Sequence, residues 1–287
     1  MKFSNIIAGV MTWGRWGKQL GTKDMQSLIE HCLDIGITTF DHADIYGAYS
    51  TESEFGTAIS AMAIERSQYQ LISKCGIQYV CDARENKVKH YNYSKDYILW
   101  SVEQSLSNLQ TEYLDLLLLH RPSPLMIAEE IAEAIEILKK EGKIKSFGVS
   151  NFNASQMDLI GFRTDINYNQ VEFSLTQHSA MHDGTFDYML SNGVGAMAWS
   201  PLGSFFKDDT PQTQRIKSVL DKLMVKYNAS ADQLLLAWIM SHPVNIAPVI
   251  GTTTKERMNL AKEALTIKLE LEDWFELLVA SQGHKVP

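Results

Sequence analysis

Short apolar runs recur along the chain, and several of them are almost continuously apolar, with little alternation of polar and apolar residues. Such runs are typical of strands that are buried on both faces of a parallel sheet. The pattern predicts eight strands, at residues 5–10, 37–40, 70–73, 114–119, 144–149, 167–171, 194–199 and 245–250.

Helical periodicity fills the segments between these runs. In the first segment, apolar residues return every three or four positions from Met25 to Leu33, and Gly36 follows as a stop signal. The same spacing recurs over 98–109 and 127–138. Because each right-handed crossover leaves its helix outside a closing parallel sheet, eight such units predict a (β/α)8 TIM barrel. Helices near 230–241 and 271–282 are extra to the repeat, and residues 1–287 are expected to form a single domain.

The lengths of the connections indicate which end of the barrel carries the function. Links from helix to strand are short, whereas the links from strand to helix at 75–94 and 203–212 are long and polar. Elaborated loops mark the working face of a protein, and in TIM barrels that face lies at the carboxyl ends of the strands. Site residues are therefore expected where the strands end.

Composition and charge exclude several classes of partner. The 26 basic and 34 acidic residues give a net charge of -8 without a long basic run, so nucleic acid and anionic membranes are not expected partners. The apolar segment 6–11 is too short for a signal core, and no stretch is long enough to span a bilayer. Cys32, Cys75 and Cys81 lack metal-ligand spacing and read as reduced thiols, so no bound metal is predicted. We expect a cytoplasmic protein that is a monomer or a weak oligomer.

Three ionisable residues stand where predicted strands end. Asp41 follows the second strand, Lys74 the third and His120 the fourth, and Tyr46 comes five residues after Asp41. Taken singly, each has a plain structural explanation. A strand-end Asp or Lys often forms a salt bridge, Tyr-Gly often forms a turn, and a His often lines a barrel rim. The presence of all four on one face favours a catalytic group.

An ordered series of short motifs surrounds these four residues. The motifs are Asp41-x-Ala43-x-x-Tyr46-Gly47, Ile72-Ser73-Lys74, the leucine-rich strand into His120, Gly148-Val149-Ser150-Asn151-Phe152, Asn169-Gln170-Val171, Trp199-Ser200-Pro201-Leu202-Gly203 and Gly251-Thr252. In this order the chain resembles the aldo-keto reductases over almost its whole length. Within that family it is similar to a bacterial subgroup with His-Arg-Pro after the fourth strand and Gly-His-Lys-Val-Pro, or a close variant, at the end.

The resemblance implies an oxidoreductase that reduces aldehydes or ketones with NADPH, with Asp41, Tyr46, Lys74 and His120 as the catalytic residues. Hydride addition to a carbonyl leaves an alkoxide that must receive a proton, and Tyr46 is the expected general acid. One ammonium about 4 Å away supplies about 4 kcal/mol at an effective dielectric of about 20. Lys74 is therefore expected to lower the pKa of Tyr46 toward neutrality. Asp41 would keep Lys74 charged, and His120 would donate to the substrate oxygen or relay the proton.

The same resemblance implies a set of contacts with the cofactor. Ser150, Asn151 and Gln170 are expected to bind the carboxamide of the nicotinamide. Trp199 is expected to stack on its ring, with a core aromatic as the alternative. Arg257, near the start of a helix, is expected to bind the adenosine 2′-phosphate, while Lys255 is either a further phosphate ligand or merely solvated. The other expected contacts are Thr12, Trp13, Ser200, Pro201, Leu202, Gly203, Gly251, Thr252 and Thr253. The pocket wall is also expected to include Trp13, Trp16, Tyr49 and Phe205, and singly exposed aromatics are the alternative for the last three.

Departures from the family pattern concern the cofactor contacts. Many members differ at the positions of His42, Trp199 and Gly251, and these differences leave the four catalytic candidates unchanged.

Two other functions remain open at the level of the sequence. The first is a non-catalytic, cofactor-binding regulatory subunit similar to the potassium-channel β-like relatives of the family, which would have a protein partner. The second is a barrel aldolase in which Lys74 forms a Schiff base with its substrate. Asp41 and Tyr46 disfavour the second function because they would keep the amine protonated.

Overall fold

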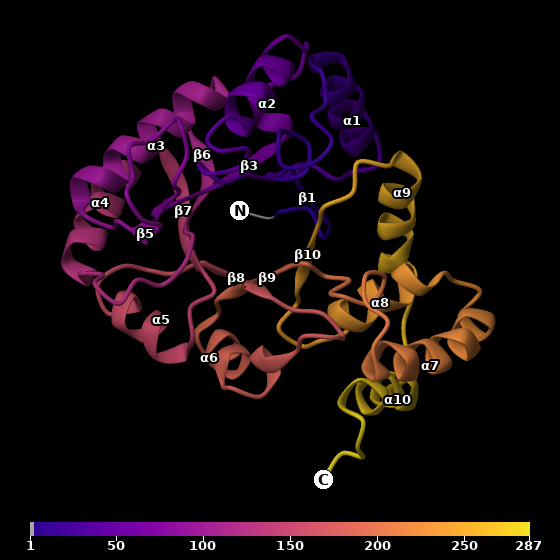
Figure 1. Ribbon diagram of the computed structural model, residues 1–287. Coiled ribbons are helices and arrows are strands. Elements are labelled where there is room, and N and C mark those ends of the chain that lie inside the picture. The colour runs from indigo at the N-terminus through magenta and orange to yellow at the C-terminus, as the bar shows by residue number, and fades with distance from the viewer. Residues whose placement is uncertain (1–2) are drawn as a thin grey trace.

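Eight parallel strands close into a barrel that helices surround (Figure 1). In this computed structural model, which describes residues 3–287, neighbouring strands follow the order β1-β10-β9-β8-β7-β6-β3-β2. All eight predicted strands are present, and the predicted TIM barrel is confirmed. The strands are β1 (Ile7–Gly9), β2 (Thr39–Asp41), β3 (Gln70–Cys75), β6 (Leu114–Leu119), β7 (Ile144–Ser150), β8 (Tyr168–Glu172), β9 (Gly195–Trp199) and β10 (Ala247–Ile250).

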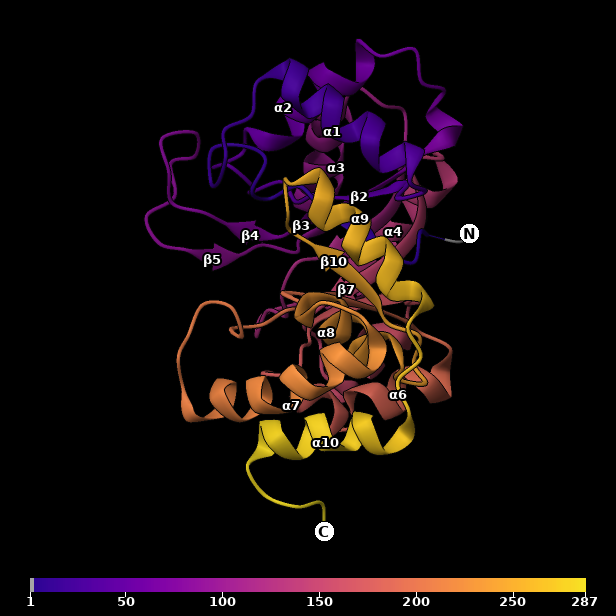
Figure 2. The same ribbon diagram turned by 90° about the vertical axis from the view of Figure 1, so that its right-hand side faces the viewer.

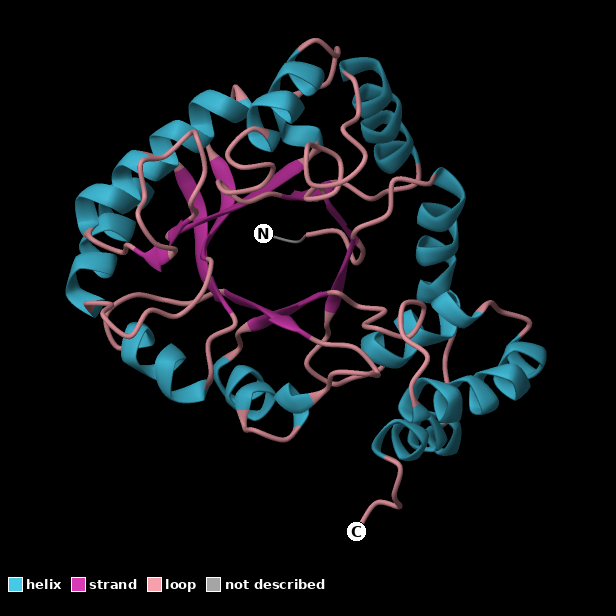
Figure 3. Cartoon of the chain, in the orientation of Figure 1, coloured by secondary structure: helices cyan, strands magenta, loops and turns pink. Residues whose placement is uncertain are grey.

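Helices cover the outside of the barrel (Figure 3). They are α1 (Thr22–Asp34), α2 (Thr51–Ser60), α3 (Lys95–Leu109), α4 (Ala128–Lys140), α5 (Ala154–Gly161), α6 (Thr185–Asn192), α7 (Pro211–Tyr227), α8 (Ala231–Met240), α9 (Lys255–Glu263) and α10 (Leu271–Gln282). Within residues 3–287, none of the helices has both the length and the apolar character needed to cross a bilayer.

The additional helices near the C-terminus are α7 and α10, which pack against each other on the outside of the molecule (Figures 1 and 2). The helix predicted near 230–241 is present as α8, but the prediction that it is extra to the repeat was wrong. It packs against β10 and α9, and every residue from Gln233 to Ile239 is buried. A helix that is apolar on most sides is a buried helix, so α8 belongs to the layer that covers the barrel.

The long connection after β3 contains a hairpin that the sequence pattern did not predict. β4 (Ile77–Gln78) pairs with β5 (His90–Tyr91) in an antiparallel arrangement. Figure 2 shows this hairpin and the loop before α7 on the same side of the barrel. Both follow the carboxyl end of a strand, and this end of the barrel is called the mouth below.

Alternation along the strands places the candidate site directly above the barrel interior. A buried cluster inside the barrel includes Ile72 of β3 and Leu118 of β6. Side chains alternate between the two faces of a strand, so the next inward positions are Lys74 and His120. In the same way, Gln170 follows the interior residue Tyr168 by two positions on β8, and Trp199 follows the interior residue Met197 by two positions on β9.

The end of the barrel opposite the mouth is closed by aromatic rings. Phe3 is buried and contacts Tyr168 edge-on, with 5.0 Å between the ring centroids. Ile7, Leu116 and Val249 fill the space between this contact and the mouth. The barrel interior is therefore a packed core, as in other TIM barrels, and the polar residues gather at one end of it.

Candidate active site

A buried lysine joins three of the four predicted catalytic residues. Lys74 Nζ donates a hydrogen bond to Asp41 Oδ2 at 2.7 Å and another to Tyr46 Oη at 3.1 Å. The carbonyl oxygen of His42 accepts a third at 2.8 Å. The three N–H groups of the ammonium are therefore all used, which a charge with only 1% exposure requires. Asp41 is fixed from its other side by Gln170, whose Nε2 donates to Asp41 Oδ1 at 2.8 Å.

The charge state of Lys74 follows from these contacts. Burial alone would lower the pKa of the amine, but the nearby Asp41 carboxylate and Tyr46 raise it above its ordinary value. Lys74 is therefore protonated at neutral pH. A protonated amine cannot attack a carbonyl carbon, and this argues against the barrel-aldolase function.

His120 completes the group from the end of β6. Its ring lies edge-on to Tyr46, with centroids 6.0 Å apart and an interplanar angle of 78°. Burial lowers the pKa of His120 well below its ordinary value, and the positive charges of Lys74, Arg121 and Lys89 lower it further. The imidazole is therefore neutral, and its buried Nδ1 has no hydrogen-bond partner among the described residues. All four predicted catalytic residues meet at the mouth.

The pKa of Tyr46 corrects one expectation from the sequence. Burial raises this pKa above its ordinary value, and the opposing effect of Lys74 does not overcome it. The sequence argument counted the ammonium alone. It omitted the loss of water around the phenol and the Asp41 carboxylate, which offsets the charge of Lys74 and itself raises the pKa. Tyr46 therefore holds its proton throughout the neutral range.

The loop that carries Tyr46 is fixed to the barrel through its backbone. The N–H of Asp44 donates to the carbonyl oxygen of Lys74 at 3.0 Å, which continues the pairing of β2 with β3. Gly47 follows Tyr46 at φ +62, and a Cβ there would lie 2.5 Å from Thr51 Oγ1. A side chain at this position would be strained by both the backbone and the contact. Gly47 therefore lets the chain turn directly into α2.

Two buried acids support this loop from behind. Asp44 and Glu52 are 6% and 2% exposed. Burial, and then the negative charge of Glu52, raises the pKa of Asp44 to about 8, against smaller lowering effects of Ser101 and Arg84. Burial also raises the pKa of Glu52, which accepts a hydrogen bond from Ser73 Oγ. In the folded protein, Asp44 is therefore protonated at neutral pH.

Replacement of Asp44 tests this assignment. The folded-state pKa of about 8 lies above the ordinary value of 3.8, so unfolding between these pH values releases a proton and stability falls as the pH rises. The asparagine side chain in Asp44→Asn is neutral at every pH, so this variant does not lose stability in this way as the pH rises. Its stability relative to the wild type should rise between about pH 4 and 8, by at most about 1.4 kcal/mol per pH unit. Urea unfolding across this range measures the difference. A difference that does not change with pH would show that Asp44 is ionised in the folded protein.

The residues expected to hold the nicotinamide form one chain of hydrogen bonds across the mouth. Trp199 Nε1 donates to Asn151 Oδ1 at 2.9 Å, and Asn151 Nδ2 donates to Ser150 Oγ at 2.8 Å. Ser150 Oγ in turn donates to the carbonyl oxygen of Gln170 at 2.8 Å. Trp199 is partly exposed, so it is a rim residue and not a core aromatic. The side chains therefore place an amide group beside a partly exposed aromatic ring.

Strained backbone occurs in the same region. Asn151 has φ 63 and Ser200 has φ 52, each directly after its strand. Left-handed backbone at residues other than glycine costs about 1–3 kcal/mol and clusters at binding sites. Gly203 has φ +54, and a Cβ there would lie 1.9 Å from Thr176 Oγ1. The turn after β9 is thus held close to the loop after β8.

The start of α9 fits a phosphate group. Its N-cap residue, Thr254, makes no capping hydrogen bond with its side chain, so the first N–H groups of the helix are free for an anion. Arg257 is exposed in the first turn, and none of the ion pairs among the described residues involves it. Lys255 Nζ instead donates to Ser27 Oγ at 2.8 Å, so it ties α9 to α1.

The other expected cofactor residues lie around the same end of the barrel. Thr12 Oγ1 donates to the carbonyl oxygen of Gly251 at 2.8 Å, and this links the loops after β1 and β10. Thr252 Oγ1 accepts from the N–H of Thr254 at 3.1 Å. Thr253 and Leu202 are partly exposed, whereas Pro201 is buried.

Trp13 does not line the pocket. Its side chain is 0% exposed, and its ring packs 6.2 Å from both Phe40 and Phe55. The side chain of Trp13 therefore cannot contact a ligand, and the expectation that it does was wrong. Trp16 lies at the mouth instead, with its ring 6.2 Å from that of Tyr46. Sequence alone could not distinguish the two tryptophans, because only the path of the loop decides which one faces the mouth.

Arg121 is a site residue that the sequence argument left without a role. It directly follows His120, and its guanidinium lies 5.3 Å from the ring centroid of Trp199. Its positive charge lowers the pKa of both Tyr46 and His120. The signal was available, because an arginine beside a strand-end histidine must lie near the same mouth.

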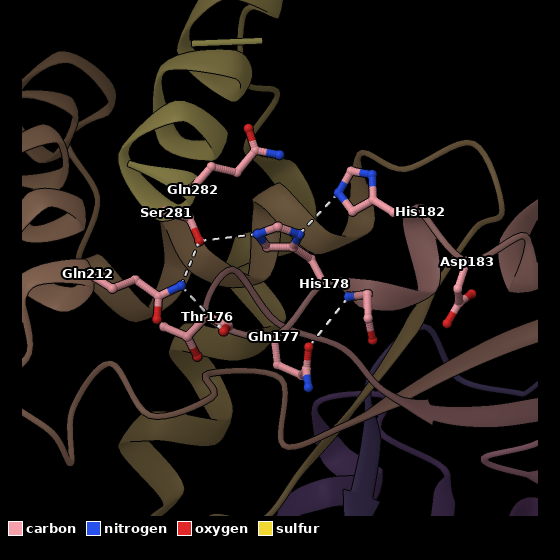
Figure 4. Close-up of a pocket in the computed structure, with 9 residues that line it drawn as sticks. Thr176, Gln177, His178, His182, Asp183, Gln212, Ser281 and Gln282 are labelled. Carbon is pink, nitrogen blue, oxygen red and sulfur yellow. Dashed lines mark hydrogen bonds between the residues drawn. The ribbon is translucent and has the colours of Figure 1, made fainter. Parts of the chain in front are cut away.

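A separate cavity of about 520 Å³ lies away from these residues (Figure 4). It is formed by the loop after β8, the start of α7 and the end of α10. Figure 4 shows His178 between His182 and Ser281, with both contacts at 3.2 Å. None of the four predicted catalytic residues lines this cavity. The reactive group therefore lies at the mouth and not in this cavity.

The fold and this group of residues define a TIM-barrel enzyme with its reactive groups at the carboxyl ends of the strands. The chain belongs to the aldo/keto reductase family, whose pattern matches residues 5–278. It is therefore an NAD(P)H-dependent oxidoreductase, and the resemblance seen in the sequence is confirmed.

Individual relatives match over the full length of the chain. It is 40% identical to the oxidoreductase YdhF of Escherichia coli, over 100% of this chain and 96% of that protein. It is 36% identical to the 6-dehydroglucose reductase of Agrobacterium fabrum, over 100% of this chain and 97% of that protein. The aldo/keto reductase of Klebsiella pneumoniae, solved with NADP and acetate, superposes with a TM-score of 0.79 at 26% identity, over 96% of this chain and 90% of that one.

Proposed function

We propose that this protein reduces the carbonyl group of an aldehyde or ketone to an alcohol, with NADPH as the reductant. The observation that carries the proposal is the hydrogen bond between Lys74 and Tyr46 Oη, made by an ammonium that Asp41 holds in place. A phenol that keeps its proton beside a fixed positive charge can protonate a developing alkoxide, because the ammonium stabilises the phenolate that remains.

Each of the four residues has a role in this reaction. When bound, NADPH supplies a hydride to the carbonyl carbon. Tyr46 transfers the proton of its Oη to the carbonyl oxygen, so one C–H and one O–H bond replace the carbonyl π bond. Solvent later returns one proton to Tyr46. Lys74 and Asp41 hold the phenol in position, and the neutral His120 orients the carbonyl oxygen by a hydrogen bond.

The proposed cofactor site extends from the mouth to the start of α9. The amide groups of Asn151 and Gln170, with the hydroxyl of Ser150, would hold the carboxamide, and Trp199 would stack on the nicotinamide. The uncapped start of α9 and Arg257 would hold the 2′-phosphate that distinguishes NADPH from NADH. The support for this assignment is the set of free N–H groups and the unpaired guanidinium at one place.

Replacement of Arg257 tests the choice of cofactor. Arg257→Ala removes a charged donor to the 2′-phosphate, and a charge-assisted hydrogen bond contributes about 1.5–3 kcal/mol. The dissociation constant of NADPH should rise about tenfold or more, whereas that of NADH should change little. Titration of protein fluorescence measures both. Arg163→Ala, an exposed arginine outside the proposed site, is the matched control. An equal change for the two nucleotides would place the 2′-phosphate elsewhere.

The activity itself is tested by the loss of NADPH absorbance with a panel of aldehydes and ketones. The panel should include a sugar aldehyde, because the Agrobacterium relative is named for 6-dehydroglucose. Turnover of any member supports the proposal. Tight NADPH binding without turnover of any of them would contradict it and would favour the regulatory-subunit function.

A further inference from the structure

Arg121 stands in the mouth of the barrel, at the end of β6. It directly follows His120, which the proposed function places against the substrate carbonyl. Among residues 3–287, no carboxylate forms an ion pair with its guanidinium. The side chain is only partly exposed, so this charge is set into the wall of the site and not extended into solvent.

The backbone of Arg121 is held rigidly. Tyr93 Oη donates to the carbonyl oxygen of Arg121 at 2.6 Å and accepts from its N–H at 3.1 Å. Tyr93 itself is 4% exposed. From this fixed origin the side chain crosses the mouth from the end of β6 to Trp199 at the end of β9. The guanidinium therefore lies over the ring of Trp199, near enough for its charge to act on both Tyr46 and His120.

Three of the loops at the mouth are positively charged although the whole chain has a net charge of -8. The loops 10–21, 76–94 and 120–127, which follow β1, β3 and β6, contain six basic residues and only two acidic ones. The charge of Lys89 acts on His120. The six basic residues are Arg15, Lys18, Arg84, Lys87, Lys89 and Arg121. This local excess attracts anions to the part of the mouth that these three loops form.

The same loops supply an aromatic wall. The ring of Trp16 lies 6.2 Å from that of Tyr46 and 5.3 Å from that of Tyr79. The mouth therefore carries flat aromatic surfaces as well as the guanidinium of Arg121. The site thus suits a molecule with a compact body and one negatively charged end.

We propose that the substrate is a carbonyl compound that also carries a carboxylate or phosphate group, and that Arg121 binds this group. This inference rests on the proposed carbonyl reduction. A guanidinium offers parallel N–H donors that match the two oxygens of a carboxylate or phosphate. Such charged hydrogen bonds are stronger than the contact with the Trp199 ring, so the side chain would turn from the ring to the anion.

Matched pairs of aldehydes test the proposal. The first pair is 4-carboxybenzaldehyde and its neutral methyl ester, and the second is glyceraldehyde 3-phosphate and glyceraldehyde. With saturating NADPH, kcat/KM of the wild type should be at least tenfold higher for the charged member of one pair. Which pair shows the preference distinguishes a carboxylate from a phosphate. Equal values within both pairs, or a preference for the neutral members, would overturn the inference.

Arg121→Met removes the charge and keeps the length of the side chain. In this variant the preference for the charged member should fall at least fivefold, mainly through KM, and Arg121→Lys should restore part of it. Lys89→Gln should reduce the preference by about half. Arg163→Met is the control, since this arginine pairs with Glu129 on the outside of the barrel. A preference that survives in Arg121→Met would overturn the role of this residue.

Binding measurements separate this inference from the proposed function. Benzoate should bind to the NADPH-loaded wild type and at least fivefold more weakly to Arg121→Met, whether or not any aldehyde is reduced. A reaction with neutral aldehydes but no binding of either benzoate or inorganic phosphate would reject only the anion site. Benzoate binding without any turnover would reject only the carbonyl reduction. If Arg121→Met weakens NADPH tenfold and leaves benzoate unchanged, the guanidinium serves the cofactor and the inference fails.

Discussion

Tyr46→Phe should bind NADPH as tightly as the wild type and lose carbonyl reduction by two orders of magnitude or more. The substitution removes only the hydroxyl group, which is the proposed proton donor, and a positioned acid contributes about 10²–10⁴-fold. The ring contacts with Trp16 and His120 can persist. Lys74 keeps its hydrogen bonds with Asp41 and the His42 carbonyl, so the fold is expected to tolerate the change.

Steady-state kinetics with a reactive aldehyde measure the loss of carbonyl reduction, and titration with NADPH measures the affinity for the cofactor. Tyr188→Phe, which removes a hydroxyl on the outer helix α6, is the matched control and should retain activity. If Tyr46→Phe reduces aldehydes as fast as the wild type, the proton comes from another group, and the neutral His120 is the first candidate.

Lys74→Met should lower both stability and activity. It leaves the Asp41 carboxylate buried with Gln170 as a donor but without its counter-ion. Breaking a buried ion pair by removing one partner costs about 3–5 kcal/mol. Carbonyl reduction should fall by at least two orders of magnitude, since the phenolate of Tyr46 would form beside an unpaired carboxylate. Urea unfolding and steady-state kinetics measure the two effects.

A second variant separates the structural effect from the catalytic one. Asp41→Asn combined with Lys74→Met removes both charges, so it should recover much of the lost stability but none of the lost activity. Lys95→Met, at an exposed pair with Glu133, is the control and should change stability by less than about 1 kcal/mol. Recovery of activity in the double variant would show that the ammonium has no part in the chemistry.

Much of this fold could be predicted because its signals are local. Near-continuous apolar runs such as Leu114–Leu119, which only Asp115 interrupts, favour central strands, and the alternation of strand and helix then leaves few closed arrangements. The meeting of Asp41, Lys74 and His120 followed from the same logic, since parallel strands end at one mouth. Their catalytic and cofactor roles remain proposals.

The features that the sequence missed depend on surroundings that are distant in the chain. The direction of the Tyr46 pKa shift depends on burial and on Asp41 as well as on Lys74, and these terms differ in sign. The burial of Trp13 and the exposure of Trp16 depend on the path of one loop. The layer to which α8 belongs depends on its contact with β10. Spacing along the chain does not contain this information.

The packed interior beneath Lys74 also limits how Tyr46 regains its proton after each catalytic cycle of the proposed enzyme. The apolar cluster and the Phe3–Tyr168 contact close the far end of the barrel, so water approaches the phenol from one direction only. A phenolate left by one reduction must take its next proton from the side on which the alcohol sits. The phenolate of Tyr46 can therefore be protonated only after the alcohol has left. The slower of these two steps, alcohol release or protonation, limits how soon a second carbonyl can be reduced.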